Sequence, residues 1–288
     1  MELAHVSDLH LPVPWERVSW GELLLSKRLL GWLNLKLKRH HPPRIAAALA
    51  ADLRARPPDH LAVTGDLTNL ALPCELEGAA AWLSGLSLPP ERLSVIPGNH
   101  DAYVGRAVRE RWFERALGPV VGEELTWPRA QRVGELLLCS ASSGVATPWF
   151  MAWGRVGPEQ LARLDAQLAA PAGGKALLVH HPPLQRDGRP DRRHRVLRDG
   201  AAVLELCRRR GVDLVLCGHT HRPFRLAPEG GPRILCAGSA TDPPRGAPGE
   251  RATYNRYRFE GGRLRGLEVR GWDPARGEFV RLLEEEVA

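Results

Sequence analysis

Apolar residues follow two alternating patterns along the chain. Short continuous runs such as 136–139 have the length of a buried strand, whereas in longer segments such as 158–169 the apolar positions recur every three or four residues. This alternation is typical of an α/β fold. We expect strands near residues 2–6, 60–64, 93–97, 135–140, 176–180, 213–217 and 233–237, and helices near 43–56, 74–86, 106–117, 158–169 and 199–210.

The last part of the pattern, residues 253–271, predicts a β-hairpin, because two alternating apolar segments flank Gly261 and Gly262. The whole chain of 288 residues, 43% of them hydrophobic, is long enough to bury a full core, and no internal repeat divides it. We therefore expect one domain over residues 1–288, with residues 15–42 as an amphipathic insert.

Polar side chains stand directly after five of the predicted strands. Open α/β sheets place their sites at the carboxyl ends of strands, so these segments are expected to meet in one site. Thr68 and Asn69, which follow the second of them, are interpreted as part of a loop or as a helix cap. The five segments are Ser7-Asp8-Leu9-His10, Gly65-Asp66, Gly98-Asn99-His100-Asp101, His180-His181-Pro182-Pro183 and Gly218-His219-Thr220-His221.

These residue types are suited to holding metal ions. Asp8 and His10 are two apart, so in an extended segment they project to the same side. Carboxylate, amide and imidazole groups together suit manganese, iron or zinc. Seven ligands exceed the needs of one ion and suit a pair about 3.5–4 Å apart, with an acidic water or hydroxide between them as nucleophile. The candidate ligands are Asp8, His10, Asp66, Asn99, His180, His219 and His221.

The ordered motifs D-x-H, G-D, G-N-H-D, H-H-P-P and G-H-T-H span residues 8–221 and resemble those of the calcineurin-like metallophosphoesterase family. The resemblance is greater to the bacterial cyclic nucleotide and glycerophosphodiester phosphodiesterases than to the protein phosphatases. It implies a β-sandwich of two mixed sheets flanked by helices. It also implies a first metal held by Asp8, His10 and His221, a second held by Asn99, His180 and His219, and Asp66 as the bridge.

The same resemblance implies roles for the residues around the metals. His100 is expected to contact the phosphate, together with Asn99, and to help protonate the leaving oxygen. Asp101 is expected to orient the imidazole of His100 and to raise its pKa, as a general acid requires. The family pattern aligns the ligand with His180 rather than with His181.

Residues 20–39 combine leucines and tryptophans with three of the four lysines of the chain. Two interpretations remain open for this amphipathic segment. It is either a helical lid that packs on the core beside the metal site, or a surface that contacts an anionic membrane or an acyl chain.

A second basic stretch, residues 186–195, follows the H-H-P-P motif directly. Arg192 and Arg193 are therefore candidates for binding substrate phosphate beyond the scissile group, and a solvated loop is the alternative. The net charge of +7 comes mainly from arginine and reflects either codon bias or an attraction for phosphate. Aromatic residues make up only 6% and none interleaves this loop, so we expect no nucleic-acid partner.

The five cysteines form no C-x-x-C pair, and three of them lie inside apolar runs, as in proteins of a reducing compartment. The N-terminus does not resemble a signal peptide, and no apolar stretch has membrane-spanning length. We expect a cytoplasmic protein, with membrane association through residues 20–39 as an alternative.

The leading functional interpretation is a dinuclear-metal phosphodiesterase that acts on a phosphate-ester small molecule or a lipid headgroup. Cyclic nucleotides and a lipid-linked phosphoanhydride of the UDP-2,3-diacylglucosamine type are alternative substrates. The usual enzyme for the latter has an arginine where His100 stands, which argues against it. A non-catalytic scaffold on the same fold is a further alternative, although scaffolds lose ligand residues and here every expected position is filled.

Overall fold

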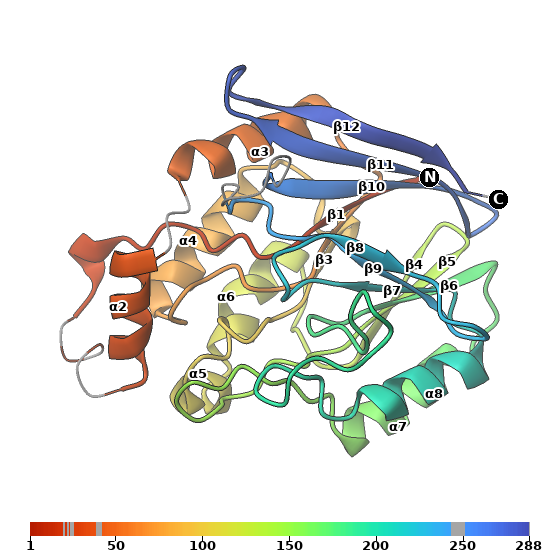
Figure 1. Cartoon of the computed structure of the whole chain (residues 1–288), viewed down its shortest axis with the longest axis horizontal. Helices are drawn as coiled ribbons and strands as arrows, with labels where there is room; N and C mark the ends of the chain where they lie inside the picture. Colours follow the sequence, from red (N-terminus) through yellow and green to blue (C-terminus); the bar gives the residue numbers. More distant parts are fainter. Residues whose placement is uncertain (20, 22, 24–25, 39–41, 243–250, 288) are drawn as a thin grey trace.

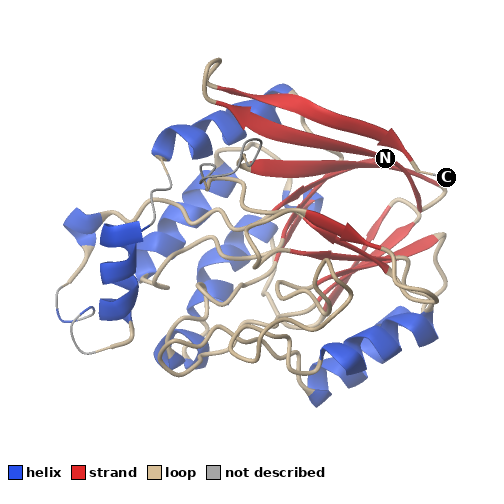
Figure 2. Ribbon diagram, in the orientation of Figure 1, coloured by secondary structure: helices blue, strands red, loops and turns tan. Residues whose placement is uncertain are grey.

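The computed structural model describes residues 1–288 except 20, 22, 24–25, 39–41, 243–250 and 288. Two six-stranded sheets pack face to face, and helices cover their outer faces (Figure 1, Figure 2). The first sheet is mixed, with three parallel strands beside an antiparallel half. Its strand order is β12 (Glu278–Glu286), β11 (Arg263–Asp273), β10 (Thr253–Glu260), β1 (Glu2–Val6), β2 (His60–Val63) and β3 (Leu93–Val95).

The second sheet is mixed as well. Its four central strands are parallel, and the two edge strands pair antiparallel with their neighbours. The strand order is β4 (Arg129–Val133), β5 (Leu136–Ser140), β6 (Gly174–Leu178), β7 (Leu214–Cys217), β9 (Arg233–Cys236) and β8 (Phe224–Leu226).

The helices lie on the outer faces of the two sheets, and some flank the polar loops. α3 (Pro43–Ala55), α4 (Pro73–Ser84) and α6 (Trp112–Val121) pack on the first sheet. α7 (Pro158–Leu168) and α8 (Gly200–Arg210) pack on the second. None of the described helices is both long enough and apolar enough to cross a bilayer. Other helical elements among the described residues are η1 (Trp15–Arg17), α2 (Arg28–Lys38), η2 (Pro90–Arg92) and α5 (Gly105–Arg109).

The core consists of three apolar layers that follow from the two-residue period of the strands. In β1, Ala4 and Val6 point to the layer under the helices, whereas Leu3 points to the layer between the sheets. In β6, Leu177 packs under α7 and α8 while Ala176 faces the first sheet. Because both faces of central strands such as β5 and β7 are buried, the sequences of these two strands are nearly continuous apolar runs.

All seven predicted strands are confirmed, as β1, β2, β3, β5, β6, β7 and β9. The predicted hairpin is confirmed as β10 and β11. The predicted helix 106–117 is two helices, α5 and α6, separated by Arg111 in the left-handed region with φ 52°. The structure also confirms the fold that the family resemblance implied, a β-sandwich of two mixed sheets flanked by helices.

The strands that the sequence pattern did not reveal, β4, β8 and β12, all lie at sheet edges. Edge strands often carry charges and lack a continuous apolar run, so their pattern is weak. In β12, for example, Glu285 pairs with Arg225, and Glu286 pairs with Arg258 at 2.5 Å. The acidic end of the chain is therefore paired with arginines at this edge of the sandwich.

Candidate metal centre

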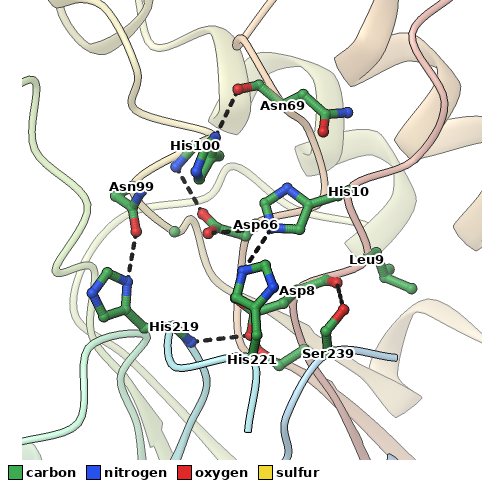
Figure 3. Close-up of polar contacts among 12 residues, drawn as sticks. Asp8, Leu9, His10, Asp66, Asn69, Asn99, His100, His219, His221 and Ser239 are labelled. Carbon is green, nitrogen blue, oxygen red and sulfur yellow. Dashed lines mark hydrogen bonds and ion pairs between the residues drawn. The ribbon is translucent and has the colours of Figure 1, made fainter. Parts of the chain in front are cut away.

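The carboxyl ends of five strands, three from the first sheet and two from the second, converge on one cluster of polar side chains. Figure 3 shows the side chains of this cluster that come from the loops after β1, β2, β3 and β7. The loops after β1, β2 and β3 provide Asp8 and His10, Asp66, and Asn99 and His100. The loops after β6 and β7 provide His180, and His219 with His221. Of these residues, His100 and His221 are partly exposed and the others are buried. The site thus lies where the two sheets meet.

The backbone is strained at five of the seven candidate ligands. Asp8, His10, Asp66, His219 and His221 all have φ between 40° and 70°. Such left-handed conformations are uncommon for residues other than glycine, and each has a free-energy cost that the surrounding contacts must offset. Strain of this kind gathers at functional sites.

Close backbone packing holds these loops in place. The amide of Asp8 donates to the carbonyl of Gly65 at 3.0 Å, and the amide of His10 donates to that of Asp66 at 2.9 Å. A Cβ atom at Gly98 would lie 2.2 Å from Asp66 Oδ1, so only glycine fits there. The glycine of the G-N-H-D motif therefore lets this loop approach Asp66.

The first set of ligand atoms comes from Asp8, His10, Asp66 and His221, and these atoms all lie within 4.8 Å of one another. His10 Nδ1 lies 3.0 Å from the carbonyl of Thr68, so this nitrogen carries the proton and Nε2 presents a lone pair to the site. His10 Nε2 lies 3.2 Å from His221 Nε2. Asp8 Oδ1 is buried, lies 3.4 Å from His221 Nε2 and accepts no hydrogen bond from any described residue.

His221 is oriented in a similar way. Its Nδ1 lies 3.4 Å from Asp242 Oδ2, so a carboxylate holds the ring with Nε2 toward Asp8. The imidazole nitrogens and carboxylate oxygens of this set, all of them electron-pair donors, lie within 4.8 Å of one another. A bound cation satisfies all of them at once, so the residues fit a metal ion.

The second set consists of Asn99, His180 and His219. His180 Nδ1 lies 2.6 Å from the carbonyl of Thr64, which leaves Nε2 facing Asn99 Oδ1 at 3.2 Å. The same amide oxygen lies 2.8 Å from His219 Nδ1 (Figure 3). Asp66 Oδ2 lies 3.4 Å from His180 Nε2 and 3.8 Å from His10 Nε2, between the two sets. This position suits the bridging role expected for Asp66.

The neighbouring His181 also belongs to a group of close ligand atoms, with His180 and His219. Both of its ring nitrogens, however, have protein partners: Nδ1 lies 2.8 Å from Ser143 Oγ and Nε2 lies 3.1 Å from the carbonyl of Ala152. The arrangement favours His180 as the ligand, as the sequence motif suggested.

Charges inside the cluster act strongly on one another. Burial raises the pKa of Asp66, but His180 and its other histidine neighbours more than offset this and hold it well below the ordinary range. Burial lowers the pKa of His180, and the carboxylate of Asp66 reverses the effect and raises it to about 9. In the metal-free protein a proton on His180 therefore occupies the nitrogen that a metal would take, so acid weakens metal binding.

His100 lies beside the cluster with its ring held from several sides. Its Nδ1 lies 2.7 Å from the carbonyl of Asn69, and its backbone amide donates to Asp66 Oδ1 at 2.7 Å. The ring stacks on Tyr103 with centroids 5.5 Å apart, and its edge contacts His10. Nδ1 thus carries the proton that the carbonyl of Asn69 accepts.

Asp101 does not take the expected place beside the imidazole of His100. Its carboxylate accepts hydrogen bonds from the amides of Gly98 and Thr68, both at 2.9 Å, and from Thr68 Oγ1 at 2.8 Å. Burial raises its pKa to about 6. Asp101 therefore ties two site loops together, and the carbonyl of Asn69, a residue interpreted from sequence as a loop or cap, orients His100 instead.

A cavity of about 600 Å³ opens over the metal centre. His194 and Arg195 of the basic 186–195 loop line it, whereas Arg192 and Arg193, the residues expected to bind phosphate, are exposed and do not. Arg195 donates to the carbonyl of His219 at 2.8 Å. The basic loop therefore does reach the cavity, but through a different arginine.

α2 and the residue before it form another wall of this cavity, through Lys27, Leu30, Gly31, Asn34 and Leu35. Arg28, which is 5% exposed, anchors the helix by donating to the carbonyls of Leu70 and Ala71. Of the segment 20–39 discussed from sequence, residues 20, 22, 24–25 and 39 lie outside the described residues.

Comparisons with known proteins agree with this geometry. The sequence model of the calcineurin-like phosphoesterase family matches residues 1–223. The chain is 31% identical over 226 residues to a probable cyclic nucleotide phosphodiesterase of Synechococcus sp., an alignment that covers 78% of this chain and 74% of that one. It is 29% identical over 231 residues to the glycerophosphodiester phosphodiesterase GpdQ of Enterobacter lignolyticus, covering 77% and 71%.

Among solved structures, the fold is similar to that of a dimetal phosphatase from Danio rerio, with a TM-score of 0.60, 13% identity and 98% coverage of both chains. At this identity the likeness concerns the fold alone. The family match spans most of the chain and includes all the strand-end motifs that build the candidate metal centre. The chain therefore belongs to the calcineurin-like phosphoesterase family.

Proposed function

We propose that this protein is a phosphodiesterase that works with two metal ions. The observation that carries the proposal is the position of Asp66 beside an open cavity, with its Oδ2 3.4 Å from His180 Nε2 and 3.8 Å from His10 Nε2. Asp8, His10 and His221 would hold one ion, and Asn99, His180 and His219 the other. When bound, the two ions would supply Lewis-acid activation of the phosphate and of the attacking water.

The residues of the chain would then complete the reaction. His100 and the amide group of Asn99 line the cavity, where both can donate hydrogen bonds to a phosphate oxygen. His100 would hold a proton on Nε2 and transfer it to the leaving alcohol oxygen, because its Nδ1–H is committed to the carbonyl of Asn69.

Two observations support a diester rather than a monoester as substrate. Both aligned relatives carry the name of a phosphodiesterase. The cavity of about 600 Å³ also leaves room beyond a phosphate for its ester groups. A cyclic nucleotide remains a candidate substrate because of the Synechococcus relative. The phosphoanhydride alternative is less favoured, because His100 occupies the position where such enzymes usually have arginine.

For residues 15–42 we propose the role of a lid within a single domain. Trp32 and Leu35 pack against a buried cluster that includes Leu70 and Tyr103, so these apolar side chains cover protein surface. Packing of this kind favours a lid over a membrane contact. Lipid headgroups as substrates and a peripheral membrane contact remain the alternative that vesicle binding would test.

The cytoplasm remains our proposed location. All five cysteines are free and buried, which suits a reducing compartment. The metals are proposed as manganese, iron or zinc, because mixed oxygen and nitrogen ligands accept all three.

The test is hydrolysis of bis-p-nitrophenyl phosphate and p-nitrophenyl phosphate with manganese, iron, zinc or no metal. We expect strong metal-dependent cleavage, with the diester preferred. His100→Ala should reduce kcat roughly 10²–10⁴-fold, the usual contribution of a general acid. Metal content measured on the same samples is the control, since His100 is not expected to bind metal and the variant should keep two ions.

Either of two results would contradict the proposal. A protein that binds two metals but cleaves neither ester at any pH would point to the scaffold alternative. A His100→Ala variant with full metal-dependent activity would remove this residue from the mechanism.

A further inference from the structure

The mouth of the cavity has an apolar side that the proposed chemistry does not use. Leu30 and Leu35 of α2, together with Phe150 and Met151 of the turn 147–151, line this side, and we name these four residues the apolar wall. Phe150 is 75% exposed and Met151 is 39% exposed. Large apolar side chains that are exposed beside a cavity are typical of a binding surface.

The backbone at Phe150 supports a role for its exposed side chain. Its φ is 63°, a left-handed conformation that bulky aromatic residues rarely adopt. The turn is held by hydrogen bonds from Thr147 Oγ1 to the carbonyl of Met151 at 2.5 Å and from the Met151 amide to the carbonyl of Pro148 at 3.2 Å. An exposed aromatic ring kept in a strained turn at the rim of a site indicates a functional constraint.

Lys27 ties the two halves of the apolar wall together. Its ammonium group donates to Thr147 Oγ1 at 2.8 Å and to the carbonyl of Met151 at 3.0 Å. It also lies 4.6 Å from the ring centroid of Tyr103, the residue that stacks on His100. Because Lys27 directly precedes α2, the helix and the turn are joined at the mouth, and the spacing across the wall is fixed.

We propose that the apolar wall is a subsite for a compact apolar ester group of the substrate, an aryl or branched alkyl group. The inference rests on the proposed phosphodiesterase function and specifies its substrate class. The wall lies in the same cavity as Asn99 and His100, so a phosphate at the metal centre can direct one substituent against it. The volume of about 600 Å³ leaves room for a group of aryl size beside the phosphate.

The test compares two phosphonates that differ only in their substituent. Calorimetric titration of the manganese-loaded protein with phenylphosphonate and methylphosphonate should give a Kd about tenfold lower for the phenyl compound, the discrimination expected of an apolar pocket for a partly buried group. Phe150→Ala should reduce the ratio of the two Kd values to about threefold or less. Each phosphonate carries a single substituent, so the result does not depend on which ester group is cleaved.

Leu282→Ala is the matched control. Leu282 of β12 is 43% exposed and apolar, but it does not line the cavity. This variant should keep the Kd ratio of the unmodified protein. Circular dichroism of all variants checks that the fold is intact.

The possible results separate this inference from the proposed function. A Kd ratio near one in the unmodified protein, or an unchanged ratio in Phe150→Ala, overturns the subsite even if diesters are cleaved. Preferential phenylphosphonate binding that depends on Phe150, in a protein that cleaves no diester, supports the subsite while contradicting the function. A third result would identify the wall as a membrane contact. In that case the unmodified protein would sediment with phosphatidylcholine and phosphatidylglycerol vesicles, Phe150→Ala would abolish the sedimentation, and the Kd ratio would be unchanged in the variant.

Discussion

The floor of the cavity and its mouth are built in different ways. Floor residues stand at the ends of buried strands, and backbone carbonyls such as those of Thr64 and Thr68 fix the tautomers of their histidines. Mouth residues come from the insert, the turn 147–151 and the basic loop 186–195, and many of them are exposed. The difference suggests that the floor determines the type of reaction and the mouth determines which substrate is accepted.

The largest effect is expected from a substitution in the floor at Asp66, the residue proposed to bridge the two metal ions. Asp66→Ala should remove at least one metal and lower kcat/KM by more than about 10³-fold, beyond the loss usual for one hydrogen-bond donor. Metal content and turnover of bis-p-nitrophenyl phosphate measure this. A variant that retained two metals and at least a tenth of the activity would show that Asp66 does not bridge them.

A smaller effect is expected at the mouth, where one arginine that lines the cavity can be compared with two that do not. Arg195→Met should lower kcat/KM about tenfold, mainly through KM, because a charge-assisted hydrogen bond to the phosphate would be lost. Arg192→Met and Arg193→Met should stay within about twofold, since neither side chain lines the cavity. Equal losses in all three variants would mean that the loop acts through its overall charge.

The last comparison uses pH, and it sets His60, a buried histidine away from the cavity, against His180 of the floor. Burial, aided by the charge of Arg129, lowers the pKa of His60 from 6.5 to about 4. Below pH 6.5 the unfolded chain therefore binds a proton at His60 that the folded chain does not bind. The free energy of unfolding falls for this reason as pH decreases from 6.5 toward 4. His180 behaves in the opposite sense in the metal-free protein: its raised pKa gives stability that is lost as pH rises from 6.5 through about 9.

His60→Gln can keep the hydrogen bond to Ser94 but cannot titrate. Its free energy of unfolding should fall less than that of the unmodified protein between pH 6.5 and 4.5, by on the order of 2 kcal/mol. Urea unfolding at the two pH values measures the difference. Identical losses in the two proteins would show that other groups dominate the acid response.

The sequence predicted the floor better than the mouth for a physical reason. Each candidate ligand follows closely on an apolar run, so the strand pattern alone places all seven at one edge. Asn69 could not be recognised in this way, because it orients His100 through its backbone carbonyl, a group that every residue has. Arg195, Asp242 and Lys27 reach the cavity only through loop conformations that no local pattern encodes.

The same contrast applies to the fold. Central strands with both faces buried, such as β6 and β7, were visible as apolar runs, whereas the edge strands β4, β8 and β12 were not. Their positions follow from pairing with a neighbour, which depends on tertiary structure.

The two sheets both contribute ligands, four residues from the first and three from the second. Ions held between them would act as a non-covalent cross-link across the interface of the sandwich. A ligand that binds only the folded chain stabilises it by about 2.7 kcal/mol at one hundred times its Kd. The availability of metal would therefore affect the thermal stability of the protein and its resistance to proteolysis.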